Sequence, residues 1–322
     1  MFTLRQYLLA LLDSRGLTRT LGEIDVCRDE QGRPCFSAGN SAAVFRIRLG
    51  GRIRSLRCYL RPMRHLKEIY GQRLLEKELY LHTSPETGVW VDTVLGDWIE
   101  GSTLHETVAQ AAALRDRESL QILVRLFDRL ALALVTDDRA HGDLKPENII
   151  VGDDGTLCPI DFDASYLPAF AGEISPELGT AAYQHPARTA ADFDERIDDY
   201  PAALISTALH ALAEDPTLWD RYGSSDGLLY TPQRIASDPA YRETLALFEK
   251  RGMAVQYRIA QLLTAPTLRL FGLAELLAEA VREKPAARSG TEAETPELFV
   301  ENGRWGYRTA ERVLSLIHIS EP

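Results

Sequence analysis

A polar block followed by two short apolar runs, near the middle of the 322-residue chain, restricts its possible folds most strongly. The block reads His-Gly-Asp-Leu-Lys-Pro-Glu-Asn over residues 141–148, and Asp-Phe-Asp follows at 161–163. The apolar runs between them, 149–151 and 157–160, have the length and composition of paired strands. We therefore expect a hairpin that holds the 141–148 loop and Asp161 in register.

Composition and the cysteine pattern exclude several classes of protein. Apolar residues make up 45% of the chain and charged residues 26%, as in ordinary globular domains, and 322 residues suffice for two domains or one two-lobed unit. No run approaches the roughly 18 apolar residues of a membrane span. The apolar run at 7–12 lacks the flanking pattern of a signal peptide. The four cysteines show no zinc-site spacing. We expect a cytoplasmic protein with reduced thiols and no membrane partner.

Charge is distributed unevenly along the chain. Residues 1–95 carry 15 basic and 10 acidic side chains, whereas the remainder carries 21 basic and 37 acidic ones. A basic first third suits nucleic acid or the phosphates of a nucleotide. The aromatic residues are not interleaved with the arginines, as a base-stacking surface would require. This pattern argues against a nucleic-acid partner.

Hydrophobic periodicity predicts a small β-rich part followed by a larger helical part, which is an α+β organisation. The strand signals are the runs 44–49 and 53–60, which flank Gly50-Gly51 and indicate a hairpin, and the run 89–95. The helix signals are at 4–12, 66–81, 120–135, 202–213 and 270–281. We expect the first part to cover residues 1–96, including an N-terminal helix, and the second to cover 97–282.

The C-terminal region has a different composition. Residues 283–297 lack large apolar side chains and are predicted to form a linker. Residues 298–313 contain an Asn-Gly turn followed by Trp-Gly-Tyr, which resembles the start of a WG-type repeat and would suit a protein partner. Residues 314–322 are interpreted as a translated sequencing adapter, with a strand of the repeat as the alternative.

The two polar blocks resemble the catalytic loop and the metal-binding motif of the eukaryotic-type Ser/Thr protein kinases, a family that includes bacterial members. The matching motifs extend over about residues 20–285. The resemblance implies a two-lobed kinase fold, with a small β-rich N-lobe and a large, mainly helical C-lobe. Phosphoryl transfer needs a carboxylate for the attacking hydroxyl, a cation for the γ-phosphate and oxygen ligands for a metal ion.

The resemblance assigns these tasks to residues of the two blocks. Asp143 would orient the acceptor hydroxyl and Lys145 would meet the γ-phosphate of ATP. Asn148 and Asp161 would bind Mg²⁺, or Mn²⁺, through oxygen atoms, which are the ligands that such ions prefer. His141 belongs to the same loop and is expected to support it.

Two later motifs support the same loop. Residues 179–186 resemble the end of an activation segment, in which Thr180 packs against Asp143 and Lys145. Asp198 would accept hydrogen bonds from the backbone of the 141–148 loop, or would act as a simple helix N-cap, and the two roles are compatible.

The nucleotide-binding motifs depart from the family pattern. Of the three glycines expected in the phosphate-covering loop before Val44, only Gly39 is present, since Ser37 and Ala42 occupy the other two positions. Glycine matters there because backbone N–H groups then approach phosphates closely. The segment 97–104 resembles the hinge, where the backbone of Asp97 and Ile99 would meet adenine.

Arg57 stands where the family has a lysine for the α- and β-phosphates. Arginine keeps the charge, but its planar fork is wider. An ordinary solvated arginine on a strand is the alternative. The carboxylate partner on the following helix would be Glu76, with Glu78 as a rival.

Three other positions also differ from the family pattern. Asp163 replaces a glycine and is predicted either to add a metal ligand or to lie in solvent. Gly142 replaces the arginine that meets a phosphorylated activation segment, which argues against that switch. Ala187 replaces a glutamate that stabilises the large lobe.

Three functions fit these features. The first is a protein kinase that transfers the γ-phosphate of ATP to a Ser or Thr hydroxyl of a protein. The second is a pseudokinase that binds nucleotide or acts as a scaffold, which the altered nucleotide motifs favour. The third is a small-molecule phosphotransferase of the antibiotic-kinase type, which shares His-Gly-Asp. The residues Lys-Pro-Glu-Asn at 145–148 and the Gly179-Thr180 pair argue against the third.

Overall fold

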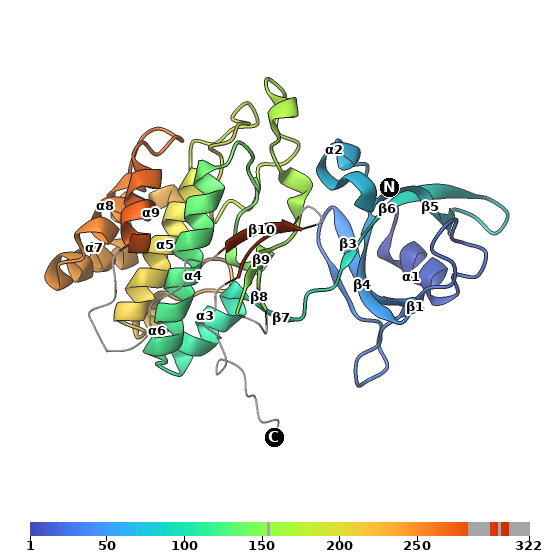
Figure 1. Ribbon diagram of the computed structural model, residues 1–322, viewed down its shortest axis with the longest axis horizontal. Coiled ribbons are helices and arrows are strands. Elements are labelled where there is room, and N and C mark those ends of the chain that lie inside the picture. The colour runs from blue at the N-terminus through green and yellow to red at the C-terminus, as the bar shows by residue number, and fades with distance from the viewer. Residues whose placement is uncertain (153–154, 283–296, 302–303, 309–322) are drawn as a thin grey trace. The chain divides into compact units, whose positions relative to one another are not determined.

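The computed structural model describes residues 1–152, 155–282, 297–301 and 304–308, the last two segments by their backbone only (Figure 1). Contacts divide the chain into two compact units, Met1–Ile99 and Glu100–Pro322. The first unit is built mainly of strands and the second mainly of helices. The predicted α+β class, with a small β-rich part before a helical one, is confirmed.

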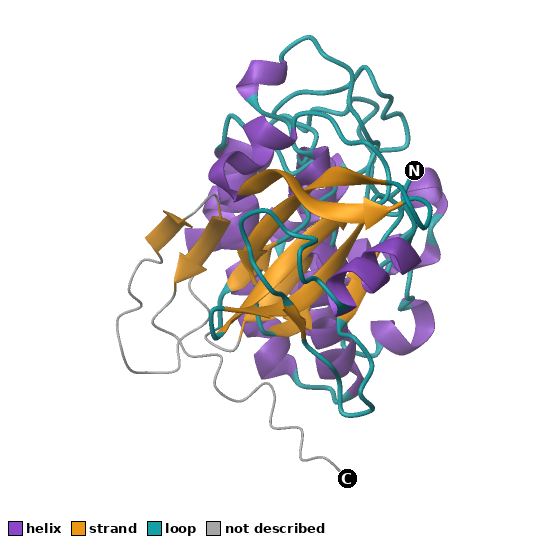
Figure 2. Cartoon of the chain, turned by 90° about the vertical axis from the view of Figure 1, so that its right-hand side faces the viewer, coloured by secondary structure: helices purple, strands orange, loops and turns teal. Residues whose placement is uncertain are grey.

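The first unit contains a six-stranded antiparallel sheet (Figure 2). Five strands follow the order β1-β3-β4-β6-β5, and β2 pairs with β3. Their bounds are Asp25–Val26 (β1), Phe36–Ala38 (β2), Ala42–Leu49 (β3), Arg52–Tyr59 (β4), Leu74–His82 (β5) and Gly88–Asp97 (β6). Gly50 and Gly51 both have positive φ angles, as a tight hairpin turn requires, and they join β3 to β4 as predicted.

One face of this sheet is covered by α1 (Leu4–Leu12), the predicted N-terminal helix. Thr3 and Gln6 form a capping box that fixes the beginning of the helix. Tyr7 and Leu11 pack in one apolar core with alternate residues of the strands, such as Phe45. Because side chains alternate across a strand, the intervening residues lie on the opposite face, called the open face below.

The helix predicted over residues 66–81 is wrong beyond its first turn. Only α2 (Leu66–Tyr70) is α-helical, followed by a 3₁₀ turn, η1 (Gly71–Arg73), and then by β5. Gly71 has a positive φ angle, which ends the helix. The pairing of β5 with β6 buries Leu79 and Leu81 in the core, and this tertiary pairing overrides the local helix propensity.

The correction changes the surroundings of both glutamates on β5. Glu76 is exposed and forms an ion pair with Lys67, at 3.5 Å between Oε1 and Nζ. Glu78 is only 2% exposed, and its carboxylate accepts the backbone N–H groups of Arg19, Thr20 and Leu21 at 2.8–3.1 Å. The buried Glu78 therefore fixes the turn at residues 19–21.

The second unit combines a small sheet with a helical core. The three-stranded antiparallel sheet has the order β7-β8-β9, with β7 at Gly101–Thr103, β8 at Ile149–Gly152 and β9 at Leu157–Pro159. The pairing of β8 with β9 confirms the predicted hairpin. The helices are α3 (Leu104–Ala113), α4 (Arg117–Thr136), α5 (Asp199–Glu214), α6 (Leu218–Tyr222), α7 (Pro239–Arg251), α8 (Ala254–Leu262) and α9 (Leu273–Arg282).

Helix α5 is the centre of this core. Nearly every one of its side chains is buried, including Tyr200, Ile205 and Leu209. It packs against α4, and a buried polar contact joins the two helices: the Asp128 carboxylate accepts from Ser206 Oγ at 2.7 Å and lies 2.8 Å from His210 Nε2. The predicted helices at 120–135 and 202–213 lie within α4 and α5.

The C-terminal region is described only in part. Strands β10 (Glu297–Glu301) and β11 (Arg304–Arg308) form an antiparallel pair, in which Val300 is opposite Trp305. The WG-type repeat over 298–313 stays a prediction. The predicted linker up to residue 296 and the predicted adapter segment at 314–322 lie outside the described residues. Within the described ranges, no helix is both long and apolar enough to cross a membrane.

Glu78→Ala should lower the free energy of unfolding by about 3 kcal/mol, because the turn at 19–21 loses a charged acceptor for several donors. Glu76→Ala is the matched control, and its exposed ion pair should contribute less than about 1 kcal/mol. Urea unfolding followed by circular dichroism measures both values. Equal losses in the two variants would contradict the structural role given to Glu78.

A second prediction concerns Asp199, which is buried at the beginning of α5. Its Oδ2 accepts the backbone N–H of Leu270 at 3.2 Å, and its Oδ1 has no partner among the described residues. Burial raises the pKa of this carboxyl to about 7 from 3.8. Between these values the folded chain binds more protons than the unfolded chain. The free energy of unfolding therefore falls as the pH rises from about 4 to about 7, by up to about 1.4 kcal/mol per pH unit.

Asp199→Asn removes this titration and keeps an acceptor for Leu270. The variant should gain stability relative to the natural chain as the pH rises through this window, and the difference should become constant above it. Urea unfolding at pH 4.5, 6 and 8 gives the two curves. Parallel curves over that range would show that Asp199 does not titrate as its burial implies.

Candidate active site

The β8–β9 hairpin brings the two polar blocks of the second unit together. The 141–148 loop leads into β8 through a short 3₁₀ turn, η2 (Pro146–Asn148), and Asp161 follows β9 after one residue. The backbone N–H of Ile160 donates to the carbonyl of Asn148 at 2.8 Å. The hairpin therefore fixes the separation of Asn148 and Asp161.

His141 links the beginning of the loop to the same hairpin. Its Nε2 lies 2.8 Å from the carbonyl oxygen of Ile160, which can only accept, so Nε2 carries the hydrogen. The other ring nitrogen, Nδ1, accepts the backbone N–H of Asp143 at 3.3 Å. The ring also contacts Phe162, with 5.0 Å between the centroids. The buried imidazole thus connects both polar blocks.

Four of the predicted residues form one hydrogen-bonded network around Asp143. The Asp143 carboxylate accepts the backbone N–H of Thr180 through Oδ1 at 2.5 Å, and its Oδ2 lies 3.3 Å from Lys145 Nζ. Lys145 Nζ also donates to Thr180 Oγ1 at 2.8 Å. The side chains of Asp143 and Lys145 are 17% and 23% exposed, so both groups remain within reach of a bound molecule.

Asn148 joins the network through its amide nitrogen. Its Nδ2 donates to the backbone carbonyl of Asp143 at 2.9 Å and to Asp143 Oδ2 at 3.1 Å. Because both partners are acceptors, the amide nitrogen faces Asp143. The amide oxygen of Asn148 is then directed elsewhere, as a metal ligand would need to be.

Asp161 has an unusual backbone conformation. Its φ and ψ angles are 68° and 64°, in the left-handed region that residues other than glycine rarely adopt. Such strain costs on the order of 1 kcal/mol and is concentrated at functional sites. It occurs here at the end of the hairpin that also carries Asn148.

The donor set of Asn148 and Asp161 fits a hard divalent cation. Mg²⁺ is commonly held by one or two carboxylates together with substrate phosphates, and it prefers oxygen ligands. Over the part of the chain that the structure describes, no group of three or more His, Cys, Asp or Glu side chains forms a self-contained metal site.

Asp163 is only 3% exposed, so the prediction that it could lie in solvent is wrong.

Asp198 anchors the loop to the buried core. Its carboxylate accepts the backbone N–H groups of His141 at 2.5 Å and Gly142 at 3.0 Å. Burial raises the pKa of this carboxyl, and the two N–H donors oppose the rise. Asp198 occupies the N-cap position of α5, but its side chain makes no capping hydrogen bond to that helix, so the carboxylate serves the loop instead.

The sequence interpretation gave no task to Gln184 or to Arg188, and Arg188 also contacts this loop. Arg188 Nη1 donates to the carbonyl oxygen of Gly142 at 3.0 Å and contacts Gln184 Oε1. Gln184 lies within the 179–186 segment, whereas Arg188 belongs to no motif with a recognisable spacing. The one sequence signal of Arg188 is its position shortly after that segment.

On the first unit, Val44 and Arg57 are opposite each other on β3 and β4 and share the open face. The guanidinium carbon of Arg57 lies 5.8 Å from the centre of the Tyr59 ring. Gly39 lies in the turn between β2 and β3, where its N–H donates to the carbonyl of Ala42 at 2.9 Å. A Cβ at position 39 would make only an ordinary contact, so this turn does not require glycine.

The predicted hinge residues come at the end of β6. The carbonyl of Asp97 accepts from Ser55 Oγ at 3.0 Å, and its carboxylate pairs with Arg54 at 3.2 Å. Ile99 is the last residue of the first unit. Glu76, predicted as a helical partner for Arg57, lies instead on β5 and pairs with Lys67.

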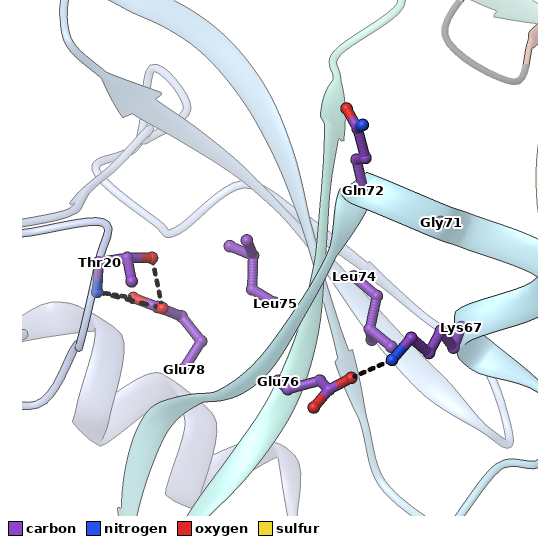
Figure 3. A pocket seen from close by; sticks show the side chains of 8 residues that line it. All are labelled: Thr20, Lys67, Gly71, Gln72, Leu74, Leu75, Glu76 and Glu78. Atoms are coloured by element: carbon purple, nitrogen blue, oxygen red, sulfur yellow. Dashed lines mark hydrogen bonds and ion pairs between the residues drawn. The ribbon is translucent and has the colours of Figure 1, made fainter.

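A hollow of about 620 Å³ lies on the first unit. Its lining residues are Thr20, Lys67, Gly71, Gln72, Leu74, Leu75, Glu76 and Glu78. Figure 3 shows the Lys67–Glu76 ion pair at this hollow and the contact of Thr20 with Glu78. The lining includes Glu76 but neither Val44 nor Arg57, so the hollow does not bring the predicted nucleotide contacts together.

No protein-family model matches the chain. Two of the curated proteins that are similar to it, both at 28% identity, are protein kinases. One is CBL-interacting protein kinase 17 from Oryza sativa subsp. japonica, over 172 residues, which is 51% of this chain and 35% of that protein. The other is serine/threonine-protein kinase PknL from Mycobacterium tuberculosis, over 213 residues, which is 62% of this chain and 52% of PknL. The matches thus span about half of the relatives' length or less. The distant relatives and the α+β architecture together support a kinase-like domain in this chain.

Proposed function

We propose that this chain is an ATP-dependent protein kinase that phosphorylates Ser or Thr hydroxyls of a protein. The observation that carries the proposal is the hydrogen-bonded network of the second unit that joins Asp143 to Lys145, Asn148 and Thr180. The names of the two distant relatives agree with this function.

Each residue of the network has a task in phosphoryl transfer. The acceptor hydroxyl oxygen forms a bond to the γ-phosphorus, the bond to the β–γ bridging oxygen breaks, and ADP leaves. Asp143 orients the hydroxyl and receives its proton, and Lys145 compensates charge on the γ-phosphate. Asn148 and Asp161 would hold Mg²⁺ or Mn²⁺, which supplies charge neutralisation at the phosphates of ATP.

The segment before Thr180 supports a protein acceptor. Thr180 bonds to Asp143 and Lys145, so residues 171–180 lead directly to the proposed reaction centre. Ile174 and Leu178 in this segment are 66% and 47% exposed. Exposed apolar side chains in a segment that leads to a reactive carboxylate suit an extended peptide better than a small polar molecule.

Nucleotide binding without transfer is the second candidate function. Two features of the first unit favour it. The helix expected to present a carboxylate to Arg57 is only five residues long, and Glu76 is paired with Lys67. Only Gly39 remains of the glycines expected in the phosphate-covering loop.

Asp143→Asn should reduce phosphate transfer by about 100-fold or more, because the hydroxyl loses its proton acceptor. The assay uses the full chain, γ-labelled ATP, and Mg²⁺ or Mn²⁺, with the chain itself and a generic protein as acceptors. Asp138→Asn is the matched control, since the side chain of Asp138 is 78% exposed and precedes the loop.

ATP binding is measured on the same samples by calorimetry. Binding without transfer in the natural chain would favour the second candidate. Transfer to aminoglycosides but not to proteins would favour a small-molecule phosphotransferase. Equal transfer by the natural chain and Asp143→Asn would refute the task given to Asp143.

Arg57→Ala should weaken ATP binding by about 10-fold or more, because a charge-assisted hydrogen bond to a phosphate is worth roughly 1.5–3 kcal/mol. Arg57→Lys should restore much of the affinity. Arg52→Ala is the control, since Arg52 is exposed at the beginning of the same strand. Unchanged affinity in Arg57→Ala would identify Arg57 as an ordinary surface arginine.

A further inference from the structure

We infer that Arg188 is a positioning residue that holds the Gly142–Asp143 peptide group in the orientation needed by the proposed reaction. The inference rests on the proposed function. It concerns a residue outside every motif identified in the sequence, and it assigns Arg188 a task in catalysis rather than in stability.

The first observation is that position 142 accepts only glycine. Gly142 has a φ angle of +81°, and a Cβ at this position would overlap the carbonyl oxygen of Ala164. No side chain at position 142 can therefore reach outward to the residues that follow Thr180. Any connection between the loop and those residues has to come from another position.

Arg188 connects the 141–148 loop to the residues that follow Thr180. Its Nη1 donates to the carbonyl oxygen of Gly142 at 3.0 Å. The N–H of the same peptide group belongs to Asp143 and donates to His141 Nδ1 at 3.3 Å. Since both ends of the peptide group are bonded, its rotation is restricted, and the Cα of Asp143 is fixed with it.

The guanidinium group is itself held on a rigid support. Gln184 Oε1 accepts from the same Nη1 atom, and the backbone N–H of Arg188 donates to the carbonyl of His185 at 2.9 Å. His185 is buried against Tyr200 of α5 and lies 3.1 Å from the carbonyl of Ala265 through Nε2. Arg188 therefore attaches the loop to the buried core through His185 and α5.

Close packing makes this arrangement specific. Gly179 has a φ angle of +71°, and a Cβ there would lie 2.7 Å from the carbonyl oxygen of Gly142 and 3.0 Å from Asp143 Oδ1. The chain at 179–180 thus rests directly on the peptide group that Arg188 holds. A rotation of that group would displace both Asp143 and the Thr180 N–H that bonds to it.

Arg188 is poorly suited to a purely stabilising task. Its Nε and Nη2 atoms are buried and have no hydrogen-bond partner among the described residues. Buried donors without acceptors cost free energy, and burial lowers the pKa of this guanidinium although Asp198 and Asp143 favour its charge. A residue that destabilises its surroundings is expected where function requires it.

The test compares Arg188→Met and Arg188→Lys with Arg196→Met in the full chain. Arg196 is a matched control because its Nη1 also donates to a backbone carbonyl, that of Val135, and its Nε is also buried without a hydrogen-bond partner among the described residues. The measurements are urea unfolding, hydrogen exchange of peptides covering 140–146 and 178–184, and kcat and KM for ATP.

For Arg188→Met we expect unchanged or higher stability, faster exchange in both peptides, and a fall in kcat of about 10- to 100-fold with little change in KM. Arg188→Lys should lie between the natural chain and Arg188→Met, and Arg196→Met should change neither the exchange nor kcat. Hydrogen-exchange rates in Arg188→Met equal to those of the natural chain would overturn the inference. A fall in kcat that is explained by a lower free energy of unfolding would also overturn it. If the natural chain transfers no phosphate, the proposed function fails, whereas the exchange data still test the restraint by Arg188.

Discussion

The buried carboxylate of Asp198 is the contact on which the proposed site depends. It joins the backbone of His141 and Gly142 to the beginning of α5, the most completely buried helix of the second unit. Two backbone N–H donors compensate part of the cost of burying a carboxyl there. Every other member of the network, from Asp143 to Thr180, is positioned relative to a loop that this contact fixes.

The site on the second unit could largely be predicted from the sequence because its geometry is local. Asp143 and Asn148 are five positions apart, and one hairpin of two short strands brings Asp161 back to the same loop. Apolar runs of this length between two polar blocks leave few alternatives to a hairpin. Thr180 could be included because its segment follows a recognisable order of residues.

The features that could not be predicted from the sequence depend on contacts between residues far apart in the chain. Residues 66–81 read as a helix because local periodicity does not reveal that β5 pairs with β6. The burial of Glu78 follows from the turn at 19–21, almost 60 positions earlier. Arg188 is 46 positions from Gly142, and a lone arginine after an alanine carries no pattern. Such residues become identifiable only once the fold places them together.

The restriction at Gly142 also limits how this chain can evolve. An arginine cannot be introduced at position 142 by one substitution, because any Cβ there meets Ala164 before the longer side chain matters. Ala164 belongs to the turn that follows Asp161, so making room would move the residue proposed to bind the metal ion. Position 142 of this chain is therefore confined to glycine unless both polar blocks are remodelled together. Homologues with this turn geometry should retain that glycine even where the surrounding sequence diverges.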